Sequence, residues 1–121
     1  MSDALFTIER LKKRPDFLAC AQAAYCARGA VLIQARPRDN EPVVRAGFTA
    51  TKRIGGSVER NRAKRRLREA ARLLLPAHAS PGFDYVFIAR GGVTSRPWSR
   101  LLDDVKSALI RLAADRDRPA S

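Results

Sequence analysis

The sequence predicts a single α+β domain in which three helices pack on a small, mainly antiparallel sheet. The chain has 121 residues, of which 45% are hydrophobic and 30% are charged, so it can build one hydrophobic core but not two. Segments with the period of helices alternate with short β-like runs, in the order α, β, β, α, β, α. We therefore expect one domain over residues 1–121, of which the charged residues 115–121 form a frayed tail.

The first half of the chain predicts one helix and a β-hairpin. Asp16 is a candidate N-cap for a helix with apolar residues at helical spacing, which should end near Gly29. Residues 30–35 are β-like, and residues 37–42 carry the Pro, Asp and Asn typical of a turn. Residues 43–51 alternate between apolar side chains and Arg, Gly or Thr, which indicates a half-buried antiparallel strand.

The second half predicts a long helix, a central strand and a final helix. Ser57 is a candidate N-cap for a helix from Val58, which Pro76 should stop. Residues 84–90 form a nearly continuous apolar run, as central strands do. A helix over 97–114 would carry one apolar stripe of Leu101, Val105, Leu109 and Leu112.

The charge of the chain is strongly positive and concentrated. There are 24 Lys and Arg against 12 Asp and Glu, a net charge of +12, and residues 52–72 hold nine basic and two acidic side chains, 9 − 2 = +7. Such a field favours a polyanionic partner. The start of the chain lacks the pattern of a secretion signal, and no apolar run approaches membrane-spanning length. We therefore expect a cytoplasmic protein that binds no membrane.

The helix predicted from Val58 is amphipathic. Its core face is an arc of Ala63, Leu67, Ala70 and Leu74. The opposite face, here called the cationic ridge, consists of Asn61, Lys64, Arg65, Arg68 and Arg72, and it is flanked by Arg60, Arg62 and Arg66. Like charges four residues apart destabilise a free helix, so the cationic ridge predicts a bound polyanion. Charge alone does not separate RNA from DNA, although the few neutral polar side chains favour recognition of backbone and shape.

The sequence offers no constellation of catalytic or metal-binding residues. His78 is the sole histidine and is expected in a solvated loop. Asp103 and Asp104 are adjacent, and neighbours on a helix point about 100° apart, so they cannot clamp one metal ion alone. Cys20 and Cys26 have neither metal-binding nor redox spacing and are expected to be reduced and buried. Any chemistry should therefore reside on the partner.

The segment from Lys52 to Glu69 resembles the Arg-Asn-Arg segment of the protein subunit of bacterial ribonuclease P. It reads KRIGGSVERNRAKRRLRE and includes the basic pair and the glycine turn that precede that motif. Residues 10–17, 45–51 and 84–90 support the resemblance, since they occur in the order of the family and at about its spacing. The resemblance covers most of the chain.

The resemblance implies the protein component of a ribonucleoprotein endoribonuclease that removes the 5′ leader from precursor tRNA. The partners would be a catalytic RNA subunit and precursor tRNA, with no DNA expected. The RNA would perform the hydrolysis with Mg²⁺ that is bound mainly by the RNA itself. The implied architecture is the ribosomal protein S5 domain 2-like fold, with a left-handed βαβ crossover around the cationic helix. The residues alone leave open a non-enzymatic RNA-binding protein of ribosome type.

Site residues carried over from the resemblance fall into two groups. Phe17 is expected to line a leader cleft between the first helix and the sheet. Phe48 is a candidate to substitute for aromatic side chains that some relatives carry where this chain has Ala21 and Ile33, although a Phe on an alternating strand more often belongs to the core. The expected RNA-contacting residues are Lys52, Arg53, Arg60, Asn61, Arg62, Lys64, Arg65 and Arg68.

Overall fold

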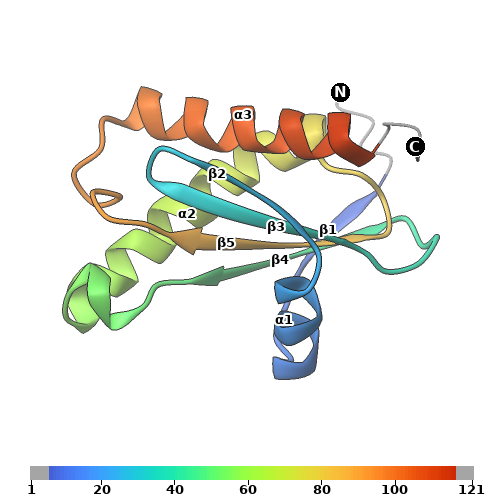
Figure 1. Cartoon of the computed structure of the whole chain (residues 1–121), viewed down its shortest axis with the longest axis horizontal. Coiled ribbons are helices and arrows are strands. Elements are labelled where there is room, and N and C mark those ends of the chain that lie inside the picture. Colours follow the sequence, from blue (N-terminus) through green and yellow to red (C-terminus); the bar gives the residue numbers. More distant parts are fainter. Residues whose placement is uncertain (1–5, 117–121) are drawn as a thin grey trace.

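A five-stranded sheet organises residues 6–116, the part of the chain that the computed structural model describes (Figure 1). The strands, in their order across the sheet, are β1 (Thr7–Arg10), β4 (Val43–Thr49), β5 (Phe83–Ala89), β3 (Val31–Pro37) and β2 (Ala24–Arg28). Strand β4 runs parallel to β1 and β5, whereas β3 is antiparallel to β5 and β2. The α+β class is confirmed. The prediction of a mainly antiparallel sheet is wrong, because half of the strand pairs are parallel.

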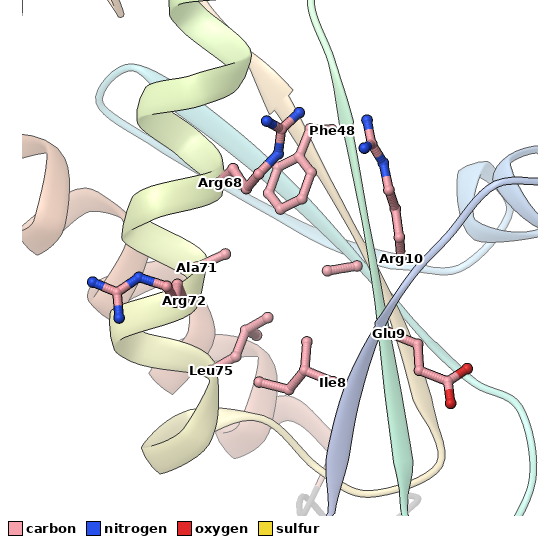
Figure 2. A pocket seen from close by; sticks show the side chains of 9 residues that line it. Ile8, Glu9, Arg10, Phe48, Arg68, Ala71, Arg72 and Leu75 are labelled. Atoms are coloured by element: carbon pink, nitrogen blue, oxygen red, sulfur yellow. The ribbon is translucent and has the colours of Figure 1, made fainter.

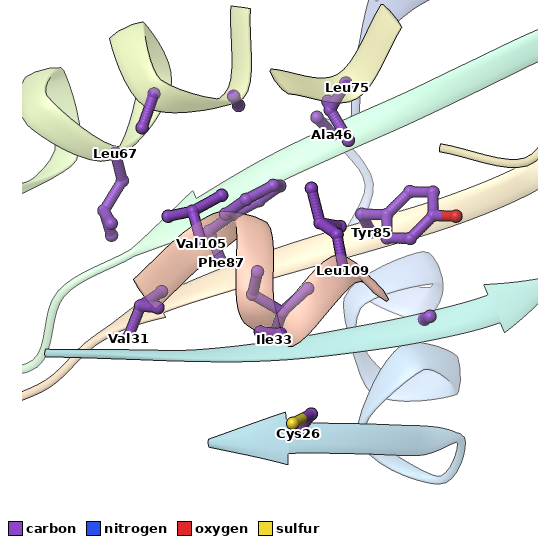
Figure 3. Packing of buried hydrophobic residues seen from close by; sticks show 14 of the residues in the cluster. Cys26, Val31, Ile33, Ala46, Leu67, Leu75, Tyr85, Phe87, Val105 and Leu109 are labelled. Carbon is purple, nitrogen blue, oxygen red and sulfur yellow. The ribbon is translucent and has the colours of Figure 1, made fainter. Parts of the chain in front are cut away.

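Helices cover both faces of the sheet, but unequally. The helices are α1 (Arg14–Ala21), the short 3₁₀ helix η1 (Lys52–Ile54), α2 (Ser57–His78) and α3 (Trp98–Arg116). Helices α2 and α3 pack on one face and enclose the main core, in which Ile33, Leu67 and Phe87 are fully buried (Figure 3). Helix α1 covers part of the other face, over a small cluster of Leu11, Cys20 and Val86. The two faces therefore differ in how much apolar surface they bury.

The first helix is shorter than predicted. Helix α1 ends at Ala21, and the chain then forms β2, which pairs with β3 in a hairpin through Gly29. Gly29 has a φ of 50°, and a Cβ there would lie 2.3 Å from the carboxylate of Asp104, which accepts a hydrogen bond from the amide of Ala30. The N-cap is Lys13 rather than Asp16, which lies in the first turn. Strand pairing thus overrides the helical spacing after Ala21.

The hairpin predicted between residues 30–35 and 43–51 is wrong. Strand β5 lies between β3 and β4, so the two predicted partners are not neighbours. The loop that joins them bonds to Gly82 instead: the amide of Arg38 donates to the Gly82 carbonyl, and the amide of Gly82 donates to the carbonyl of Val43. Strand β1, which the sequence analysis did not predict, pairs in parallel with β4.

Helix α2 has the predicted core face but different ends. Ala63, Leu67 and Ala70 are buried as predicted, together with Ala71 and Leu75, whereas Leu74 is half-buried. The helix starts at Ser57 after an N-cap at Gly56, so Ser57 is not the cap. It continues past Pro76 to His78, although Pro76 has no amide hydrogen to donate to the carbonyl of Arg72. His78 is therefore helical rather than in a loop, and burial and nearby Lys106 lower its pKa.

The remaining predictions about the second half are largely correct. Strand β5 is central and mostly buried, and the apolar stripe of α3 faces the core. Of the predicted tail 115–121, Asp115 and Arg116 form the end of α3, and 117–121 lie outside the described residues. Both cysteines are free and buried, as predicted.

A cluster of ion pairs fastens α1 to the sheet. Asp84 on β5 is fully buried, and its carboxylate accepts hydrogen bonds from Arg45 at 2.6 and 2.8 Å and from Arg38 at 2.6 Å. Arg36 lies 3.4 Å from the same carboxylate. Arg45 also contacts Asp16 of α1 at 3.3 Å. We call these five residues the Asp84 cluster; within it, the hydrogen bonds to Asp84 raise the pKa of Arg45.

Candidate nucleic-acid interface

The N-terminal half of α2 presents basic side chains that no carboxylate neutralises. Within residues 6–116, no ion pair joins an acidic group to the cationic side chains Arg60, Arg62, Lys64, Arg65 and Arg68. Arg62, Arg65 and Arg68 are exposed, while Arg60 and Lys64 are half-buried. Arg72, at the C-terminal end of the cationic ridge, instead pairs with Glu69 at 2.5 Å, and this contact raises the pKa of Arg72. The unpaired positive charge therefore ends at Arg68.

Arg66 differs from its basic neighbours because it points toward the protein. Its guanidinium donates hydrogen bonds to the carbonyls of Val93 and Arg96, both at 2.6 Å, and lies 5.7 Å from the centre of the Trp98 ring. These contacts hold the loop that precedes α3. The Arg66 guanidinium is thus engaged within the protein, and Arg66 is not among the predicted RNA contacts.

A shallow depression gathers half of the predicted RNA-contacting residues. Its lining includes Asn61, Lys64, Arg65 and Arg68 of α2, and also Arg10 of β1 and the exposed Val58. A second depression continues from Arg10 over Lys12, Lys13 and Arg45, beside Glu9 and Asp16. Arg10 was missed as a site residue because β1 was not predicted. The basic run from Arg10 to Arg14 was the available signal.

Lys52 and Arg53 lie at the other end of the basic surface. Both are exposed on η1, which directly precedes α2 and contacts it. They line a depression with Arg90 and Gly91, at the C-terminal ends of β4 and β5. Arg90 is a further basic residue that the sequence analysis did not include in the site.

The two predicted leader-cleft residues lie on opposite faces of the sheet. The Phe17 ring packs against Gly47, where a Cβ would come within 2.6 Å of it, and joins the small cluster under α1. Phe48 points to the main core, where its ring stacks on Phe87 with centres 5.2 Å apart and an interplanar angle of 26°. Successive side chains of a strand alternate between faces, so Phe17 and Phe48 do not share a cleft. Ile33, at one of the two substituted positions, is fully buried in the main core.

An exposed aromatic side chain that the sequence analysis missed lies on the Phe17 face. Tyr25 of β2 pairs with Gln34, which pairs with Val86, and Val86 belongs to the cluster under α1. Directly paired residues share a face of a sheet, so Tyr25 is on the α1 side, where it is 66% exposed. Its prediction required β2, which the sequence analysis read as part of a helix.

Residues 6–116 lack both a metal-binding cluster and a membrane-spanning helix. These residues contain no group of three or more His, Cys, Asp or Glu side chains arranged to hold a metal ion. None of their helices is both long and apolar enough to cross a membrane.

Fold and site together define a small basic α+β protein that carries a strongly cationic surface on one helix. The family model described as Ribonuclease P matches residues 6–113. The ribonuclease P protein component of Caulobacter vibrioides is 69% identical over 121 residues, covering 98% of this chain and 81% of the relative. That of Ruegeria pomeroyi is 52% identical and covers 88% of each chain.

Solved structures of ribonuclease P proteins share the fold of this chain, although their sequence identity to it is lower. The ribonuclease P protein from Thermotoga maritima superposes with a TM-score of 0.71 at 24% identity, covering 85% of this chain and 96% of that one. The Staphylococcus aureus protein gives 0.69 at 22%, covering 86% and 94%. The chain belongs to the bacterial ribonuclease P protein family. It is thus the protein component of a ribonucleoprotein endoribonuclease in which RNA carries the catalysis, as the sequence analysis predicted.

Proposed function

We propose that the N-terminal half of α2, with η1, binds phosphates of the ribonuclease P RNA. The main support is the set of basic side chains on α2 that have no carboxylate partner within residues 6–116. Burying or crowding such charges is unfavourable unless an anion neutralises them, and arginine forks suit phosphate oxygens. The proposed contacts are Lys52, Arg53, Arg60, Asn61, Arg62, Lys64, Arg65 and Arg68.

The α1 side of the sheet is our proposed site for the single-stranded 5′ leader of precursor tRNA. Two observations support it. Phe17 is only half-buried, and Tyr25 presents an exposed ring on the same face. Aromatic side chains bind single-stranded RNA by stacking on bases with little sequence preference. Phe48 is not part of this proposal, since it faces the other side of the sheet.

Further properties of the assembly are part of the proposal, and membership of the family supports them. Mg²⁺ would be held mainly by the RNA, and the enzyme would act in the cytoplasm as a single RNA-binding domain that does not bind DNA. The S5 domain 2-like fold with a left-handed crossover is also proposed; the segment concerned is β4–α2–β5, in which α2 joins two adjacent parallel strands.

Reconstitution tests the proposed function. The chain is mixed with the RNA subunit of Caulobacter vibrioides ribonuclease P and Mg²⁺, and leader removal from precursor tRNA is measured at near-physiological salt. We expect the protein to accelerate cleavage by the RNA. Equally fast cleavage by the protein alone, or no binding to the RNA, would contradict the proposal. Co-purification with ribosomal subunits instead of one discrete RNA would favour the ribosome-type alternative.

A further inference from the structure

A groove on the main-core side of the sheet lies between β1 and the C-terminal half of α2 (Figure 2). Its volume is about 370 Å³, within the usual range of roughly 300–1,000 Å³ for sites that bind small ligands. The groove remains open because Ala46 of β4 and Ala71 of α2 contribute only methyl groups to its walls. A flat group of modest size would fit there.

The interior of the groove is apolar. Ile8 of β1, Phe48 of β4 and Leu75 of α2 line it, and Ile8 is 42% exposed. Phe48 is held in place by stacking on Phe87 from the core side. An exposed apolar surface of this kind favours a ligand that brings an apolar or aromatic face of its own.

The rim of the groove is cationic. Arg10 and Arg68 line both this groove and the basic depression on α2, so the two surfaces are continuous. The Arg68 guanidinium lies 5.8 Å from the centre of the Phe48 ring. Figure 2 shows the Glu9 carboxylate directed away from the groove, and Arg72 is already paired with Glu69. A ligand at the rim therefore meets two arginines that have no acidic partner within residues 6–116.

We propose that this groove binds one unpaired nucleobase of the RNA that occupies the cationic ridge. The base would enter between Ile8 and Leu75, beside Phe48, while Arg10 and Arg68 hold the adjoining phosphates. An apolar slot bordered by cations matches the chemistry of a nucleotide, which joins an aromatic base to an anion. The inference rests on the proposed function and adds a base-binding pocket to what is otherwise a surface for phosphates.

A pair of tryptophan variants on β1 tests the groove. Ile8→Trp fills it without changing the charge, whereas Thr7→Trp places the same bulk on the opposite face of β1, at a position that is also exposed. We expect Ile8→Trp to weaken binding to the Caulobacter vibrioides RNA by roughly 5- to 150-fold, the range for loss of one stacked base. The slope of log affinity against log salt should not change, since no phosphate contact is removed. Thr7→Trp should bind like the wild type.

The outcomes separate this inference from the proposed function. Equal affinity of the two variants, with wild-type binding intact, would overturn the groove alone. A wild-type chain that binds no RNA would overturn both. Changed self-association of Ile8→Trp in sedimentation, without a change in RNA affinity, would instead identify the groove as a contact between copies of the chain.

Crosslinking provides a test that does not depend on how the variants fold. The wild-type chain is irradiated in complex with the same RNA, and peptide–nucleotide adducts are mapped by mass spectrometry. Adducts on the peptides that carry Ile8 and Phe48 are expected. Adducts confined to α1, η1 and the exposed face of α2 would overturn the proposal.

Discussion

Two groups of arginines in this protein have opposite environments. In the Asp84 cluster, Arg36, Arg38 and Arg45 surround one buried carboxylate. On the cationic ridge, Arg65 and Arg68 are exposed and have no acidic partner within residues 6–116. The same side chain therefore stabilises the fold in one place and leaves it electrostatically unsatisfied in the other.

The comparison shows why net charge by itself does not locate a binding surface. Each arginine of the Asp84 cluster adds to the charge of +12, yet its guanidinium is already engaged inside the protein. Only the arginines without internal partners can release counterions from RNA. We make four predictions, in order of decreasing expected effect, and those on Asp84 and Arg65 test this division directly.

Replacing Asp84 with Asn should cause the largest loss of stability. The substitution leaves three guanidinium groups around a buried site without their shared anion, and removing one partner of a buried ion pair costs about 3 kcal/mol or more. Urea denaturation would measure the fall in the free energy of unfolding. Asp39→Asn is the matched control, because Asp39 pairs with Arg38 at the surface and its loss should change stability little. Similar effects of both variants would mean that burial of the Asp84 carboxylate does not set its contribution to stability.

Phe17→Ala should weaken the binding of leader-bearing precursor tRNA by about 1–3 kcal/mol, the usual contribution of one stacked base. Affinity for tRNA that lacks a leader should remain unchanged. Leu18→Ala is the control, since Leu18 is the next residue of α1 and is 54% exposed. Equal losses with and without the leader would place leader recognition elsewhere.

Arg65→Ala should reduce the salt dependence of RNA binding. Loss of one phosphate contact lowers the slope of log affinity against log salt by about 0.7–0.9, which filter binding at several salt concentrations can resolve. Arg111→Ala provides the control, because Arg111 of α3 pairs with Asp115. A slope unchanged by Arg65→Ala would mean that an unpaired arginine is not sufficient to identify a phosphate contact.

Replacing Cys20 with Ala should have the smallest effect, which is a change in how the free energy of unfolding depends on pH. Burial, and next the charge of Asp84, raise the pKa of this thiol from 9.0 to about 11. The unfolded chain therefore releases this proton near pH 9 while the native chain retains it, so stability should fall between about pH 9 and pH 11. Urea denaturation of Cys20→Ala over the same range should show a smaller fall. An identical pH dependence would mean that the fold does not raise the pKa of this thiol.

Sequence reasoning succeeded where one element determines its own pattern. The core face of α2, the apolar stripe of α3 and the central position of β5 follow from local periodicity, and the structure has all three. It failed where a segment becomes a strand only by pairing with a distant segment of the chain. Strand β1 has no alternating pattern of its own, and all four of its residues are exposed.

The candidate site divides in the same way. Arg65 and Arg68 could be selected from the sequence because they lie opposite the core face of a single helix. Arg10 and Tyr25 could not, since each belongs to a strand that exists only through its partner. Phe17 and Phe48 were placed in one cleft because the sequence does not reveal that a single sheet separates them.

The sequence by itself determined the amphipathic character of α2 and the excess of positive charge near its start, because helical spacing and net charge are local properties. The tertiary structure decided which arginines are neutralised and which remain available, because that depends on carboxylates far away in the chain. Asp84 lies 39 residues from Arg45 and reaches it only through the parallel pairing of β4 with β5. The number of charges can therefore be read from the sequence, but the ion-pair partner of each charge is known only from the fold.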